Sequence, residues 1–207
     1  MLKSVIAVIA ALLAMAVGSC FADADEDSST TLKLRATLYM VALESDFPSA
    51  RDSAFRTADG TVLHRASHKF IADAAIQGSA QLNDGRIVMY AGDDNGAIHW
   101  KVSRHPYAVG ASGCPLLPFR SASVDKRVIP LGTKLIIPET RGMELPDGTV
   151  HDGVWYAVDT GGAIKRDRVD LFVGAGKAPL ELAKRYGIGH LSKLDVKLAG
   201  HIPSCPA

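Results

Sequence analysis

Short apolar segments separated by turn residues fill most of the chain after residue 33, and this pattern limits the fold more than any other feature. Apolar runs of this length, bounded by Gly, Pro, Asn or Asp, are typical of β-strands. A chain with many short strands and few helices predicts an all-β fold, closed or nearly closed as a β-barrel. The expected strands are Leu34–Ala42, Phe70–Ile76, Arg86–Ala91, Ala97–Val102, Lys134–Ile137, Val154–Asp159, Arg168–Val173 and Asp195–Leu198.

One short C-terminal helix is expected over Ala178–Tyr186. Pro179 fits the first turn of a helix, where its missing N–H costs nothing, and Gly187 fits the position just after the end. No linker divides the chain, so residues 34–207 are expected to form a single domain, with a β-rich insertion at about 45–110.

The first 19 residues are typical of an export signal, because Lys3 precedes the apolar run Val5–Val17, which is too short to span a bilayer. Two cleavage sites fit. Val17-Gly18-Ser19-Cys20 resembles a bacterial lipobox, in which Cys20 is lipidated, and Ala22-Asp23-Ala24 suits a soluble signal. Residues 20–33 are expected to form a polar tether. The chain is therefore expected to be exported to a cell envelope, periplasm or outer membrane, with membrane contact only through a lipid anchor at Cys20.

The chain has three cysteines, Cys20, Cys114 and Cys205. If Cys20 is lipidated or removed, an even pair remains in an oxidising compartment, and a disulfide between Cys114 and Cys205 is expected. The alternative is two unrelated buried thiols. Cys205 lies two residues from the C-terminus between Pro203 and Pro206, which favours the bridge because such a tail rarely packs by burial alone.

Charge argues against nucleic acid as a partner. The formal net charge is +1, and without Lys3 the chain carries 22 basic and 22 acidic residues. A neutral chain lacks the positive field that attracts phosphate backbones. The histidines do not form a ligand-spaced metal set, so we expect neither a metal nor a cofactor. The sequence gives no sign of the oligomeric state.

The candidate chemistry lies around a glycine-rich turn. Asp159 ends one expected strand, Gly161 and Gly162 allow a sharp turn, and Asp170 lies in the next strand, 11 residues after Asp159. Two acids so placed can face each other across a groove, and burial among apolar neighbours would raise their pKa values. The alternative is that the aspartates only make turns by accepting backbone hydrogen bonds.

The block Asp159-Thr-Gly-Gly-Ala-Ile-Lys165, with Asp170 downstream and Val124–Thr133 upstream, resembles the 3D domain, a family named for three aspartates. The same block forms the catalytic barrel of the membrane-bound lytic transglycosylase A family. The resemblance implies a six-stranded double-psi β-barrel that acts on peptidoglycan. It assigns Asp170 as the main acid/base, Asp159 as its support in the groove, and Asp125 as the first aspartate, with either a catalytic or a structural role.

The function implied is lytic transglycosylation of glycan strands in cell-wall turnover. Thr160, Gly161, Gly162, Ala163 and Lys165 are the expected substrate contacts, although Lys165 also fits a solvated turn residue. Two alternatives stay open: a non-catalytic peptidoglycan-binding envelope module, and a true O-glycosyl hydrolase that uses Asp159 and Asp170 as a carboxylate pair.

Overall fold

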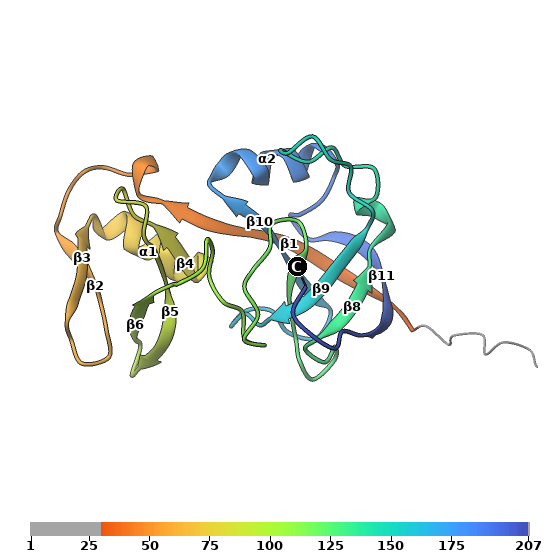
Figure 1. Cartoon of the computed structure of the whole chain (residues 1–207), viewed down its shortest axis with the longest axis horizontal. Helices are drawn as coiled ribbons and strands as arrows, with labels where there is room; N and C mark the ends of the chain where they lie inside the picture. The colour runs from red at the N-terminus through yellow and green to blue at the C-terminus, as the bar shows by residue number, and fades with distance from the viewer. Residues whose placement is uncertain (1–29, 207) are drawn as a thin grey trace, which may run out of the picture.

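The computed structural model describes residues 30–206. Six strands close a barrel, which is the right-hand body in Figure 1. They pair in the order β10-β7-β9-β8-β11-β1, and β1 pairs again with β10 to close the ring. The pairs β1–β10 and β7–β9 are parallel and the other barrel pairs are antiparallel, an arrangement compatible with a double-psi barrel. The six strands are β1 (Thr31–Leu43), β7 (Ser121–Val124), β8 (Thr133–Ile136), β9 (Val154–Asp159), β10 (Arg168–Ala175) and β11 (Ser192–His201). The expected all-β barrel is confirmed.

The barrel interior is filled by alternate side chains of its strands. Ala36, Leu171 and Trp155 are among the residues of this core, and each is almost fully buried. Because side chains alternate across a strand, the residues between them face outward. On β1 and β10 these outward positions include Thr37 and Asp170, which places polar groups on the outer wall of the barrel.

A second body, here called the lobe, follows β1 in the chain and is the left-hand body in Figure 1. The end of β1 pairs with β4, and the sheet continues through β5 to β6. Phe55, Phe70 and Trp100 pack together in the core of the lobe. The lobe consists of the 3-10 turn η1 (Glu44–Asp46), β2 (Ser53–Arg56), β3 (Val62–Ala66), α1 (His68–Gln77), β4 (Ser79–Gln81), β5 (Ile87–Asp94) and β6 (Ala97–Val102).

The expected strand at Phe70–Ile76 is wrong, because this segment lies in helix α1. Ser67 caps the helix by accepting a hydrogen bond from the Phe70 N–H at 3.2 Å, and Gly78 ends it with a φ of 80°. Phe70 and Ala74 are buried one helical turn apart. The turn at 83–85 joins β4 to β5 as a hairpin.

The expectation of a single helix is wrong because α1 is a second helix. The C-terminal helix is confirmed as α2 (Lys177–Arg185). Strands β2, β3, β4 and β7 were not expected, nor was the short 3-10 turn η2 (Pro138–Thr140). Each of these strands has five residues or fewer, too few for a clear alternating pattern.

The N-terminal predictions fall mostly outside the described residues. The signal peptide over residues 1–19 and Cys20 lie outside them, and β1 begins at Thr31, inside the expected tether. Within residues 30–206 no helix has the length and apolar character needed to cross a membrane.

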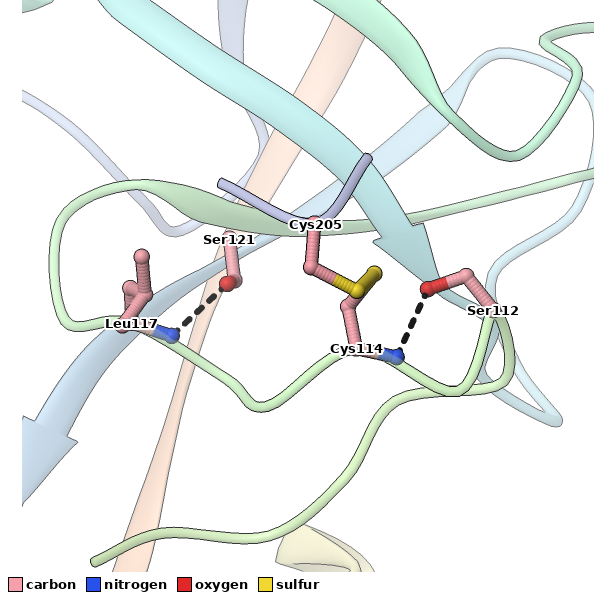
Figure 2. Close-up of a disulfide and its surroundings, with 5 residues drawn as sticks. All are labelled: Ser112, Cys114, Leu117, Ser121 and Cys205. Carbon is pink, nitrogen blue, oxygen red and sulfur yellow. Dashed lines mark hydrogen bonds between the residues drawn. A yellow bond between two sulfur atoms is a disulfide. The ribbon is translucent and has the colours of Figure 1, made fainter. Parts of the chain in front are cut away.

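Cys114 and Cys205 form the disulfide that the sequence predicts, with Cα atoms 5.4 Å apart. The bond joins the tail after β11 to the loop that leads into β7, as Figure 2 shows. We call residues 107–117 the bridged loop. Inside it, the Ser112 hydroxyl oxygen accepts a hydrogen bond from the Cys114 N–H at 3.3 Å. The Ser121 hydroxyl oxygen, at the start of β7, accepts one from the Leu117 N–H at 2.8 Å. The tail is thus fixed to a segment of the outer barrel wall.

Candidate active site

Four polar residues form a row across the outer wall of the barrel. Thr37 on β1 is the register partner of Asp170 on β10, and Asp170 is the partner of Ser123 on β7. Ser123 is in turn the partner of Asp159 on β9, directly after a break in the β7–β9 register. Directly paired residues point to the same face of a sheet. The row therefore brings Asp159 and Asp170 to one surface, although they lie on strands that do not pair with each other.

Asp159 is held by three hydrogen-bond donors. Its Oδ2 accepts from the Ser123 hydroxyl at 3.1 Å and from the Tyr39 hydroxyl at 3.3 Å. Its Oδ1 accepts from the Ala111 N–H of the bridged loop at 3.0 Å. These donors come from three separate segments, so the carboxylate has a fixed orientation. The buried Tyr39 phenol is kept protonated as a donor, because burial and then the charge of Asp159 raise its pKa.

Asp170 lies in a contrasting environment. The side chain is half-buried, and its Oδ1 is shielded from solvent without a hydrogen-bond partner in residues 30–206. Burial raises the pKa of Asp170 to about 6, and the nearby charge of Asp159 adds to the rise, while Thr37 and Arg168 oppose it. Asp170 makes no salt bridge in the described part of the chain. A carboxyl group with this pKa can both give and take a proton near neutral pH.

A groove of about 860 Å³ runs between the barrel wall and the lobe, and both carboxylates line it. The barrel contributes Tyr39, Ser123 and the bridged loop, and the lobe contributes the end of α1 and parts of β5 and β6. A smaller cavity, of about 370 Å³, lies between the end of β1 and the start of α2 and contains neither Asp159 nor Asp170. The larger groove is therefore the candidate site.

The expected substrate contacts lie at this groove, with one exception. Thr160, Gly161, Gly162 and Lys165 line it, whereas Ala163 does not. A side chain at Gly161 would put a Cβ only 2.7 Å from the Ile164 side chain, so the turn needs glycine there. The Lys165 ammonium donates to the Gly161 carbonyl oxygen at 3.1 Å, which folds the exposed lysine back over the turn.

No group of three or more His, Cys, Asp or Glu side chains within residues 30–206 is placed to hold a metal ion. His64, which shares a helix-like spacing with His68 in the sequence, instead lies on β3 with its Nε2 2.9 Å from Glu44 Oε1. That contact ties the β2–β3 hairpin to the chain after β1.

Comparison with known proteins gives the site a context. Residues 120–188 match the model of the 3D domain family. Over 103 residues the chain is 30% identical to the membrane-bound lytic murein transglycosylase A of Vibrio cholerae, a match that covers 48% of this chain and only 28% of that protein.

Two solved structures share the fold. A crystal structure of E. coli MltA with bound chitohexaose is similar with a TM-score of 0.57 at 18% identity, covering 83% of this chain and 72% of that one. A membrane-bound lytic murein transglycosylase from Agrobacterium tumefaciens is similar with a TM-score of 0.54 at 15% identity, covering 81% of this chain and 73% of that one. The fold of the barrel with its lobe is thus similar to that of these two structures.

The segment that matches the 3D domain family contains only part of the groove. Of the polar groove residues, Ser123, Asp159 and Asp170 lie within residues 120–188, but Tyr39 lies on β1, before this segment. Sequence reasoning missed Tyr39, Thr37, Ser123 and the Ala111 amide. Tyr39, Thr37 and Ser123 are polar residues inside expected or unrecognised strands, and only long-range strand pairing shows that they meet. Ala111 lies in a loop and carries no local signal.

Asp125 is not in the groove. Its Oδ1 accepts from the Arg127 N–H and Nε at 3.1 and 3.0 Å, and its Oδ2 accepts from Arg127 Nη2 at 2.8 Å and the Arg166 N–H at 3.0 Å. These bonds, first among them those of the Arg127 side chain, hold the pKa of Asp125 well below its usual range. Asp125 thus ties the start of the segment 125–129 to the turn before β10, which is a structural arrangement.

We expect Asp125→Asn to lower the melting temperature at pH 7 while leaving the activity of the folded protein within a few-fold of wild type. The depressed pKa means that the stabilisation by Asp125 is present above the unfolded pKa of about 4 and is lost as pH falls below it. The difference in melting temperature between variant and wild type should therefore be smaller at pH 3 than at pH 7. Large loss of activity with an unchanged melting temperature would contradict the structural role.

Proposed function

We propose that this groove cleaves the glycosidic bond between N-acetylmuramic acid and N-acetylglucosamine in peptidoglycan, as a lytic transglycosylase that forms 1,6-anhydro ends. The observation that carries the proposal is Asp170, a groove carboxyl whose pKa is raised to about 6 beside a second, firmly held carboxylate. The relationship to the MltA proteins supports it. That relationship covers just over a quarter of the Vibrio protein, so the activity is proposed for this chain and rests on its own groove.

The mechanism needs one acid that later acts as a base. Asp170 in its protonated form gives its proton to the bridging oxygen as the bond from that oxygen to C1 of the muramic residue breaks. The ionised Asp170 then takes the proton of the muramic 6-hydroxyl as O6 bonds to C1, so no water is consumed and the carboxyl is restored. Asp159, fixed by three donors, lies where a negative charge can stabilise the oxocarbenium-like centre that develops at C1.

The lobe is proposed as the second wall of the substrate groove. The lobe and the bridged loop together supply most of the residues that line the groove with the two carboxylates. Thr160, Gly161, Gly162 and Lys165 are proposed to contact the glycan from the barrel side. In the cell, the chain is proposed to be exported to the bacterial envelope, with Cys20 as a lipid anchor and glycan strands as the partner.

A true O-glycosyl hydrolase is the second candidate, because two carboxylates line the same groove. The hydrolase would use Asp159 as base or nucleophile and would add water to the products. The two candidates therefore differ in the mass of what they release.

The test is the chemistry of the products. The purified protein is incubated with peptidoglycan sacculi, and the soluble muropeptides are analysed by mass spectrometry. Products lighter by one water than hydrolytic fragments are expected. Fragments that carry the added water would show that the protein is a hydrolase and not a transglycosylase. If no muropeptides are released and the protein pellets with the sacculi, the protein is a peptidoglycan-binding module and neither enzyme.

A further inference from the structure

Arg168 is a cation beside the candidate acid that the mechanism above does not use. It lies two residues before Asp170 on β10, so both side chains are on the outer face of the barrel wall. Its Nη2 donates to the Thr37 hydroxyl oxygen at 3.3 Å, and Thr37 is the direct partner of Asp170 on β1. Thr37 thus holds the guanidinium next to Asp170.

Two buried polar atoms at this place lack partners. The Nε of Arg168 and the Oδ1 of Asp170 are both shielded from solvent without a hydrogen bond in residues 30–206. One is a donor and the other an acceptor, and no salt bridge joins the two side chains. Unpaired buried groups are unfavourable, and a guanidinium pairs more strongly with a carboxylate than with a neutral carboxyl. Ionisation of Asp170 would therefore favour a rotation that pairs them.

The other groups that face Asp170 do not supply this positive charge. Asp159 on β9 is negative, Tyr39 and Thr37 on β1 are neutral hydroxyls, and Ser123 on β7 is neutral. Lys165, on the turn after β9, is bonded to the Gly161 carbonyl oxygen. Among the charges that shift the pKa of Asp170, Arg168 lowers it and Asp159 raises it.

We propose that Arg168 is a positioning residue that pairs with Asp170 after the carboxyl has given up its proton, and so lets one side chain act first as acid and then as base. This inference rests on the proposed function. Without Arg168, the carboxylate formed between the two steps would lie half-buried beside Asp159 with no cation to stabilise it. Arg168 itself exchanges no proton, because its guanidinium stays charged throughout.

The test is a titration of the Asp170 carboxyl by carbon-13 NMR in wild type, Arg168→Met and Arg168→Lys. We expect the midpoint to rise by about one pH unit in Arg168→Met, since loss of a nearby opposite charge typically shifts a carboxyl by about 1–3 units. Arg168→Lys keeps the charge and should shift it less. Arg166→Met is the matched control, because Arg166 is exposed and contacts Asp125 only through its backbone N–H.

An unchanged midpoint in Arg168→Met, or an equal rise in Arg166→Met, would overturn the proposal. Arg168→Gln is measured if the Met variant does not fold. In the activity profile, the general acid is lost as pH rises through the pKa of Asp170, so the falling limb should move to higher pH in Arg168→Met, with a lower kcat and little change in KM. The NMR midpoint can be measured without turnover, so the two claims fail separately. A wild type that does not cleave peptidoglycan would contradict the proposed function. A midpoint that is unchanged in Arg168→Met would contradict only the inference about Arg168.

Discussion

Asp170→Asn is expected to lower the release of anhydro muropeptides about 10³- to 10⁴-fold, because the amide can neither donate the proton to the bridging oxygen nor remove one from the 6-hydroxyl. General acid–base catalysis typically contributes a factor of about 10²–10⁴, and here one group serves both steps. The measurement is the initial rate of muropeptide release from sacculi. Asp159→Asn keeps the acid and is expected to lose less, about 10- to 100-fold.

The stability of Asp170→Asn distinguishes a loss of activity caused by lost chemistry from one caused by misfolding. The folded pKa of Asp170, about 6, lies above the unfolded value of about 4, so its ionisation destabilises the folded state as pH rises from 4 to 6, and the full cost is present above pH 6. Asp170→Asn should therefore be more stable than wild type at pH 8, by about 1–3 kcal/mol, and closer to it at pH 4. An inactive variant that is also less stable at pH 8 would indicate that Asp170 supports the fold.

The second large effect concerns the disulfide. Replacing both Cys114 and Cys205 by serine is expected to lower stability by about 2–4 kcal/mol, because the bond closes a loop with a sequence separation of 91 and restricts the unfolded chain. That loss corresponds to a fall of roughly 5–15 °C in melting temperature for a domain of this size. The double variant leaves neither Cys114 nor Cys205 behind as an unpaired thiol, and wild type with and without reductant is the matched control. Melting temperatures that agree within about 1 °C would contradict the expectation.

Loss of the disulfide should lower the activity less than it lowers the stability. The bridged loop is also held by the Ser112 N–H, which donates to the Val158 carbonyl oxygen at 2.9 Å, and by the Ala111 contact to Asp159. Gly110 packs so closely on β9 that a Cβ there would lie 2.5 Å from the Val158 oxygen. Well below its melting temperature, the double variant should therefore keep most of the wild-type rate.

Much of the site could be predicted because its chemistry is local in sequence. Asp159, the glycine turn and Asp170 lie within 12 consecutive residues, and the block that resembles the 3D domain contains all of them. The barrel was predictable from its longer strands, since β1, β9, β10 and β11 each show a clear apolar pattern. The disulfide could be predicted from the parity of the cysteines together with the expected export signal.

The remaining features depend on contacts between distant segments. Nothing near Tyr39 or Ser123 in the sequence indicates that both bond Asp159, because only the pairing of β1, β10, β7 and β9 brings them together. The error at α1 has a different origin. The apolar residues 70, 71, 74 and 75 have helical spacing, and the caps Ser67 and Gly78 bound them, but the run is short enough to resemble a strand as well.

The row of polar residues has a consequence for the smallest unit that could work. Thr37, Ser123, Asp159 and Asp170 come from four strands, and the first of these strands begins at Thr31, long before the 3D segment that starts at residue 120. A truncated chain limited to residues 120–188 would lack β1 and β11, two of the six barrel strands, and with them the closing pair β1–β10. Residues 120–188 therefore contain the aspartates but not the complete barrel that holds them in place. In this protein the missing strands, β1 and β11, come from the two flanking parts of the chain.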